Sequence, residues 1–150
     1  MTIEMATTAE QWKTVEDNIV KEHAWYSRIK ELCSSEVLNL RRMLPAGESK
    51  INHYNNIVNE AWQKATSINA TYFIIASNWL PIFAFAKDFK LNKDIQITGS
   101  YTAGTYKGLP IIASPCLDPF EMICGALEST PTYDIENIDA GKFVVLKLED

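Results

Sequence analysis

The first part of the chain carries apolar residues at helical spacing. They recur every three or four positions, with Glu22 at the one polar position of the series. Such spacing gathers apolar side chains on one side of a helix. Thr7 or Thr8 can cap its start, so we expect a helix over about 8–33. The apolar stripe consists of Trp12, Val15, Ile19, Tyr26, Ile29 and Cys33.

A second helix is expected after a short break. The first helix either continues through residues 37–40 or restarts after Ser35, and Pro45 ends it in both cases. A new apolar stripe then predicts a helix over about 49–66. That stripe consists of Ile51, Tyr54, Ile57, Val58, Ala61, Trp62 and Ala65.

Beyond residue 70 the pattern changes to short β-prone runs. The run at 72–76 is continuously apolar, as in strands that are buried on both faces. Ser77 or Asn78 then caps a short helix with Pro81 in its first turn. Helices first and strands later predict an α+β fold, in which long N-terminal helices precede a mixed or antiparallel sheet with a short helix. The further strands are expected at 95–98, 109–114, 122–127 and 143–148.

Composition and charge argue against some classes of binding partner for this chain. With 150 residues, 47% of them hydrophobic and 22% charged, the chain fits one soluble globular unit. The net charge of −5 arises in residues 101–150, which hold eight acids and three bases. A nucleic-acid partner is not expected, because that binding needs clustered Lys and Arg. No apolar run approaches the roughly 20 residues of a membrane helix, and the first residues show no secretory signal.

The three cysteines offer a thiol hypothesis. The odd number favours free thiols, and their spacing matches no metal motif. Cys116 or Cys124 could act as a nucleophile activated by His53. The alternative is structural: Cys124 lies in a buried strand, Cys116 in a proline-rich turn and His53 in solvent. We favour this alternative because cysteine is among the most buried residue types.

Two acidic clusters offer a cation hypothesis. Asp134, Glu136 and Asp139 form one cluster, and Asp118 and Glu121 form the other. Carboxylate oxygens bind Ca²⁺, but the spacing lacks the framework of a calcium loop. We therefore favour a solvated acidic loop, and the sequence commits to no catalytic, cofactor-binding or metal-ligating residue.

We expect the glycines and tryptophans to serve the fold and not a binding site. Gly104 and Gly108 match no phosphate-binding motif and are expected in turns that need a positive φ. The four tryptophans fall at helical positions where core packing is the default. Trp25 lies off the stripe of the first helix and has the alternative of facing a partner subunit. The stripe itself is expected to pack on its own sheet, with a neighbouring chain as the alternative.

Residues 69–125 carry three short motifs in a fixed order. They are IIASNW at 74–79, GTYKGLPI at 104–111 and MICG at 122–125. This series resembles the C-terminal half of major capsid proteins with the Hong Kong 97 type fold, from tailed phages and their relatives. The resemblance covers somewhat over a third of the chain.

The resemblance implies a two-part organisation and a structural role. Residues 1–68 would form a helical, peripheral-domain-like segment, and residues 69–150 a β-rich, axial-domain-like segment, within one compact unit. The chain would be a non-enzymatic subunit of an icosahedral capsid, or a truncated fragment, since 150 residues leave little room for the arm, hairpin loop and spine helix of complete members. Its partners would be copies of itself in pentamers and hexamers, with scaffold or portal proteins. It would be found in the virion, and in the host cytoplasm during assembly.

The capsid interpretation makes one structural prediction. The strands at 72–76, 109–114 and 122–127 should share one sheet. Two other function classes stay open: a non-catalytic adaptor whose acidic C-terminal region binds a basic partner, and a small thiol-dependent enzyme.

Overall fold

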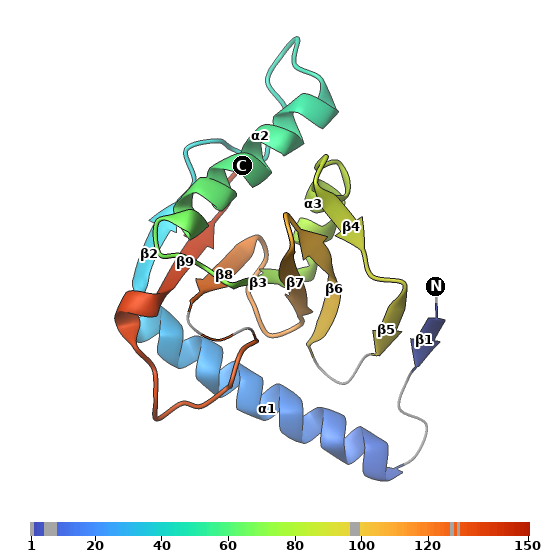
Figure 1. Cartoon of the computed structure of the whole chain (residues 1–150), viewed down its shortest axis with the longest axis vertical. Coiled ribbons are helices and arrows are strands. Elements are labelled where there is room, and N and C mark those ends of the chain that lie inside the picture. Colours follow the sequence, from blue (N-terminus) through green and yellow to red (C-terminus); the bar gives the residue numbers. More distant parts are fainter. Residues whose placement is uncertain (1, 5–8, 97–99, 127, 129) are drawn as a thin grey trace.

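The computed structural model describes residues 2–4, 9–96, 100–126, 128 and 130–150 (Figure 1). Within them the fold is α+β, with three α-helices and a seven-stranded mixed sheet. The helices are α1 (Ala9–Leu32), α2 (Lys50–Thr66) and α3 (Leu80–Ala84), with 3₁₀ turns at Ser77–Trp79 and Ala140–Lys142. The strands are β1 (Thr2–Glu4), β2 (Ser34–Val37), β3 (Tyr72–Ala76), β4 (Phe89–Leu91), β5 (Asp94–Gln96), β6 (Tyr101–Tyr106), β7 (Leu109–Ser114), β8 (Glu121–Gly125) and β9 (Phe143–Lys147).

The large sheet has the strand order β2-β9-β8-β3-β7-β6-β4. Two neighbouring pairs are parallel, β2 with β9 and β3 with β7, and the other pairs are antiparallel. Strands β1 and β5 form a separate parallel pair. The three strands that the capsid interpretation places in one sheet are adjacent, in the order β8-β3-β7, so that prediction is confirmed.

Helices α1 and α2 cover opposite faces of this sheet (Figure 1). Successive side chains of a strand point to opposite faces. In β3, Phe73 packs against Trp62 of α2, with ring centroids 6.1 Å apart. Its neighbour Tyr72 faces the other side, where Tyr133 lies. Tyr133 in turn contacts Trp25 of α1 at 5.2 Å. All five residues of β3 are buried, as the sequence predicts for a strand covered on both faces.

The two long helices match their predictions within a residue or two. Ser49 caps α2, and its side chain accepts a hydrogen bond from the N–H of Asn52. Thr7 and Thr8, the expected caps of the first helix, lie outside the described residues. The strands at 72–76, 109–114, 122–127 and 143–148 are confirmed as β3, β7, β8 and β9, although residue 127 is not described. The strand at 95–98 begins as β5, and its residues beyond 96 are not described.

The expectation that the first helix continues or restarts beyond Ser35 is wrong. Helix α1 ends at Leu32, and Ser34–Val37 form β2, paired in parallel with β9. The N–H of Leu38 extends this pairing by a hydrogen bond to the Lys147 carbonyl. Serines are weak helix formers, and the edge of β9 offers hydrogen-bond partners, so the strand is the better solution. The 1–68 segment thereby contributes a strand to the sheet of the 69–150 segment.

The start of α3 also differs from the prediction. Pro81 lies in the first turn as expected, but neither Ser77 nor Asn78 caps the helix, because both lie in the 3₁₀ turn before it. The Asn78 side chain instead accepts a hydrogen bond from the N–H of Phe120 at 2.9 Å. Asn78 therefore connects the β3–α3 junction to the loop before β8.

The two glycines of the β6–β7 region have different roles. Gly108 has a φ of +84°, and Lys107 before it has a φ of +49°, so they form the two-residue turn between β6 and β7. Gly104 does not have a positive φ, so the turn expectation is wrong for it. A Cβ atom at Gly104 would collide with the carbonyl oxygen of Lys90 and the ring of Phe89. Gly104 is required by the close approach of β4.

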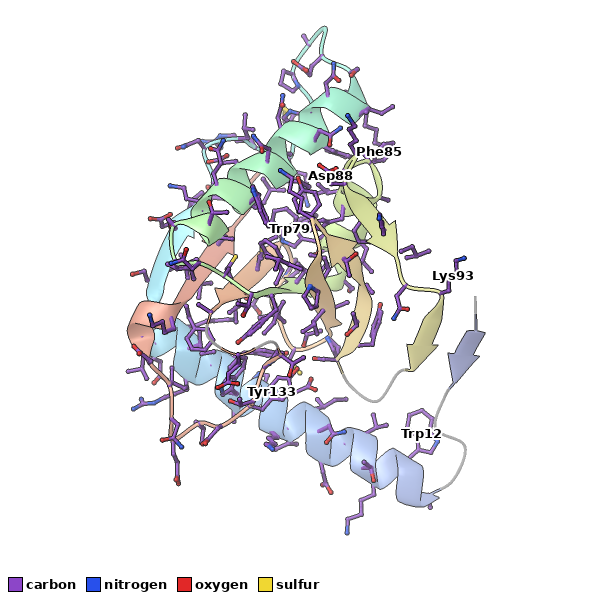
Figure 2. All side chains as sticks on the ribbon, in the orientation of Figure 1. Trp12, Trp79, Phe85, Asp88, Lys93 and Tyr133 are labelled. Atoms are coloured by element: carbon purple, nitrogen blue, oxygen red, sulfur yellow. The ribbon has the colours of Figure 1, made fainter. Side chains whose placement is uncertain are left out.

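The two tryptophans on α1 have opposite environments, and only Trp25 packs in the core as predicted. Trp12 is 50% exposed, so its expected core packing is wrong. Figure 2 shows it at the outer end of α1, away from the sheet. Trp25 is 1% exposed and contacts Tyr133 and Phe143, so it cannot face a partner subunit. The stripe of α1 packs on its own sheet only in the second half of the helix, from Glu22 onward.

Candidate functional site

The thiol hypothesis finds no support in the geometry. His53 is 3% exposed, contrary to its expected solvation, because its Nε2 atom lies 2.7 Å from the Arg41 carbonyl oxygen. Cys116 directs its sulfur to the Ile19 carbonyl, and Cys124 is fully buried in β8. Burial raises the pKa of both thiols. Within the described residues, neither sulfur is hydrogen-bonded to a histidine.

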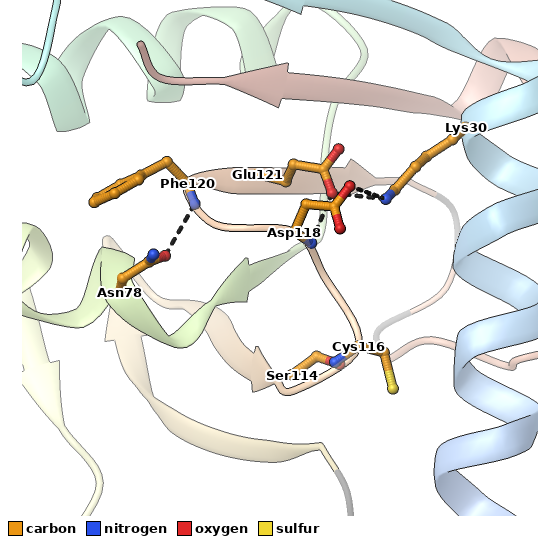
Figure 3. Close-up of polar contacts among 7 residues, drawn as sticks. All are labelled: Lys30, Asn78, Ser114, Cys116, Asp118, Phe120 and Glu121. Atoms are coloured by element: carbon orange, nitrogen blue, oxygen red, sulfur yellow. Dashed lines mark hydrogen bonds and ion pairs between the residues drawn. The ribbon is translucent and has the colours of Figure 1, made fainter. Parts of the chain in front are cut away.

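One acidic cluster forms a structural ion-pair site (Figure 3). Lys30 of α1 lies 2.7 Å from Glu121 and 3.3 Å from Asp118. Glu121 also accepts a hydrogen bond from the N–H of Asp118 at 2.8 Å. Burial lowers the pKa of Lys30, but its contacts with the two carboxylates outweigh this and raise it. These carboxylates hold the loop before β8 against α1.

The other acidic cluster stabilises its own loop. Asp134 accepts hydrogen bonds from the Asn137 side chain and from the N–H of Glu136, and these bonds lower the pKa of Asp134. Asp139 accepts from the N–H of Gly141. No group of three or more possible metal ligands lies together in the described part of the chain.

A buried polar network joins α1 to the sheet. Glu22 is 5% exposed and accepts hydrogen bonds from both the N–H and the Oγ of Ser100, at 3.2 and 2.7 Å. Since the Ser100 hydroxyl donates to Glu22, the Tyr26 hydroxyl donates to Ser100, over 3.1 Å. The network fixes where α1 lies, and burial raises the pKa of Tyr26 far above its ordinary value.

Several large apolar side chains are exposed on the surface. Scattered single residues of this kind are ordinary, whereas gathered ones mark interaction sites. The exposed large apolar residues are Trp12, Val20, Leu32, Val37, Met43, Leu44, Ile51, Leu91 and Ile135.

Ile51 belongs to a cluster of lysines and aromatic rings, which we call the basic aromatic patch: Lys50, Ile51, Tyr54, Phe85 and Lys87. The Tyr54 and Phe85 rings contact each other at 5.4 Å, and the Lys50 ammonium lies 5.7 and 5.3 Å from them. The N–H of Lys87 is bonded to the Asn55 side chain, which brings Lys87 beside α2. The patch thus joins the first turn of α2 to the end of α3.

Ile135 belongs to a segment of opposite charge, the acidic loop at 128–139. The side chains of Glu128, Asp134, Glu136 and Asp139 are exposed there, and the stretch has no Lys or Arg. Ile135 is 46% exposed between two of these carboxylates. Figure 2 shows Phe85 of the basic aromatic patch beside the first turns of α2, and Tyr133 of the acidic loop beside α1, on opposite sides of the sheet.

The basic aromatic patch is not encoded in the local sequence. Its residues come from two segments about 30 positions apart, and only tertiary contacts bring them together. The sequence predicts the charged cluster of the acidic loop, whereas the exposure of Ile135 within it is visible only in the structure.

Comparison with known proteins gives no assignment. No family model, no curated protein and no solved structure matches the chain. Among the described residues, no helix has the length and apolar character to cross a membrane.

Proposed function

We propose that this chain is a structural subunit, or a fragment of one, of a phage-type icosahedral capsid with the Hong Kong 97 type fold. The observation that carries the proposal is the sheet order β8-β3-β7. The motif at 74–79 begins in β3 and runs into the 3₁₀ turn after it, the motif at 122–125 lies within β8, and the motif at 104–111 contains the β6–β7 turn and the start of β7. Motifs that resemble the family in the sequence are thus neighbours in space.

Two further features support a role in repeated contact. Exposed apolar side chains lie at separate places on the surface, as a subunit with several neighbours requires. The ionisable side chains of Lys30 and Glu22 are already paired within the chain, with Glu121 and Ser100. The partners would be copies of the chain, joined by scaffold or portal proteins, in the virion and earlier in the host cytoplasm.

Negative-stain microscopy of the concentrated protein, with and without co-expressed phage partners, tests the proposal. Rings, sheets or shells of uniform subunit spacing are expected. Images that show only isolated particles under both conditions would contradict it.

A second function is favoured by the acidic loop. A non-catalytic adaptor would use the exposed carboxylates at 128–139 to bind a basic partner. Its binding would weaken steeply with salt, because interactions between exposed charges are screened. Binding to a lysine-rich peptide that weakens from 50 to about 500 mM salt, without self-association, would favour the adaptor over the capsid subunit.

A further inference from the structure

The charge of this chain is divided between two parts of the molecule. Residues 41–107 hold eight Lys or Arg and four Asp or Glu, a net charge of +4. The remaining residues hold six bases and fifteen acids, a net charge of −9. The basic aromatic patch lies in the first part and the acidic loop in the second, so one molecule carries two surfaces of opposite charge.

The basic aromatic patch has the composition of a protein-binding surface. Lys50 and Ile51 precede Tyr54 on α2 by four and three residues, so each of them neighbours Tyr54 on the surface of the helix. Ile51 is 55% exposed, and the Tyr54 and Phe85 rings are half-buried beside it. Aromatic rings flanked by cations are enriched at protein interfaces.

The acidic loop has the complementary composition. Ile135 projects from the surface between Asp134 and Glu136, so an apolar side chain is flanked by two carboxylates. Asp134 accepts hydrogen bonds from the N–H of Glu136 and from the Asn137 side chain, and these bonds order the turn at 134–137 that carries Ile135. A preformed loop loses less conformational freedom on binding.

We propose that the acidic loop of one copy docks on the basic aromatic patch of a second copy. This inference rests on the proposed self-assembling function and names its contact. Ile135 would pack on Ile51, Tyr54 and Phe85, and the loop carboxylates would meet Lys50 and Lys87. Two exposed acids lie near the patch in sequence, Glu48 and Asp88, and they are outnumbered by Lys50, Lys87 and the exposed Lys90.

The contact is head-to-tail because the loop and the patch lie on opposite sides of the sheet (Figure 2), so one two-fold axis does not bring both loop–patch pairs together. Such heterologous contacts build rings when the rotation closes, and open chains when it does not. A two-fold dimer through the same patch is not expected, because two basic patches would repel each other. The geometry therefore predicts rings or filaments rather than isolated dimers.

Charge reversal tests the contact in the full chain. The patch-reversed variant carries Lys50→Glu and Lys87→Glu, and the loop-reversed variant carries Glu128→Lys and Glu136→Lys. These side chains are exposed, and Asp134 is left in place because it holds the loop. The control variant carries Lys93→Glu and Lys147→Glu, which changes the net charge as the patch-reversed variant does. Figure 2 shows Lys93 away from Phe85.

Sedimentation velocity over a concentration series is the measurement, with near-ultraviolet circular dichroism to show that each variant is folded. We expect each reversed variant to associate at least tenfold more weakly than the unmodified chain, and the control to associate unchanged. An equimolar mixture of the two reversed variants should recover association, because each offers the surface that the other lacks.

The outcomes separate this contact from the proposed function. If the unmodified chain and both reversed variants associate equally, the contact is wrong and self-assembly stands. If both variants lose association and the mixture does not recover it, the two surfaces do not meet each other. If the unmodified chain stays monomeric throughout, the contact and the proposed function both fail.

Discussion

The two faces of the seven-stranded sheet are covered by different chemistry. On the face under α2 and α3, aromatic rings contact one another edge to face, with Tyr106 lying 5.7 Å from Trp62 and 5.9 Å from Phe83 between ring centroids. On the face under α1, the Glu22–Ser100 hydrogen bonds are buried beside the aromatic side chains. Apolar packing is non-directional, whereas hydrogen bonds fix a position. The α2 face should therefore supply more stability, and the α1 face more positional specificity.

Truncating an aromatic ring on the α2 face should have the largest effect. Phe83 is 1% exposed and contacts Trp79, Phe89 and Tyr106. Phe83→Ala should lower the free energy of unfolding by about 3–5 kcal/mol, through lost burial and a cavity. Phe83→Leu, the control, should lose clearly less. Urea denaturation measures both, and a loss under about 1 kcal/mol for Phe83→Ala would contradict the comparison.

Breaking the polar network on the α1 face should cost less. Glu22→Ala removes both acceptors of Ser100 and leaves its N–H without a partner. We expect a loss of about 2 kcal/mol in unfolding free energy. Glu22→Gln keeps one acceptor oxygen and should lose about half as much. Equal stability of Glu22→Ala and the unmodified chain would show that the network does not hold α1.

Alkaline pH should act mainly through the α1 face. Burial raises the pKa of Tyr26, Tyr72 and Tyr133 above the ordinary value of 10.0. The folded state keeps these protons when the unfolded state releases them, so stability is full below pH 10 and falls as the pH rises further. Urea denaturation between pH 8 and 11 should show this decline, and Tyr26→Phe should make it shallower. A flat profile above pH 10 would contradict the burial of these hydroxyls.

The smallest expected effect concerns the Cys116 thiol, whose sulfur lies against the Ile19 carbonyl of α1. Burial raises the pKa of Cys116, so less of it is thiolate at neutral pH. Iodoacetamide should therefore modify the folded chain more slowly than it modifies free cysteine, and Cys116→Ser should leave the slow rate of the remaining thiols. Modification faster than free cysteine would instead support the thiol-enzyme hypothesis.

Local pattern predicted most of this fold. Both long helices and the strands β3, β7, β8 and β9 are marked by continuous apolar runs or helical spacing, which local sequence encodes. Strands β1, β2, β4 and β6 are not predicted by the sequence. β1 and β4 have only three residues each, and the sequences SSEV and YTAGTY of β2 and β6 carry serine, threonine and glycine in place of apolar alternation. The strand form of β2 and β6 depends on the neighbouring strands β9 and β7.

The candidate surfaces were less predictable than the fold. His53 was expected in solvent, and only the Arg41 carbonyl, from a loop before α2, explains its burial. Tyr54 and Phe85 meet through the packing of α2 on α3, which no spacing in the sequence reports. Interaction surfaces of this kind depend on contacts between distant segments, and so they become visible only in the structure.

The central claim is that the chain works by touching copies of itself. Mass measurement by light scattering across a concentration series tests it most directly, starting from the subunit mass of 17.0 kDa. The account predicts that the mass rises with concentration toward ring-sized multiples of the subunit, and that high salt reverses the rise. A mass of one subunit at every concentration and salt would contradict it.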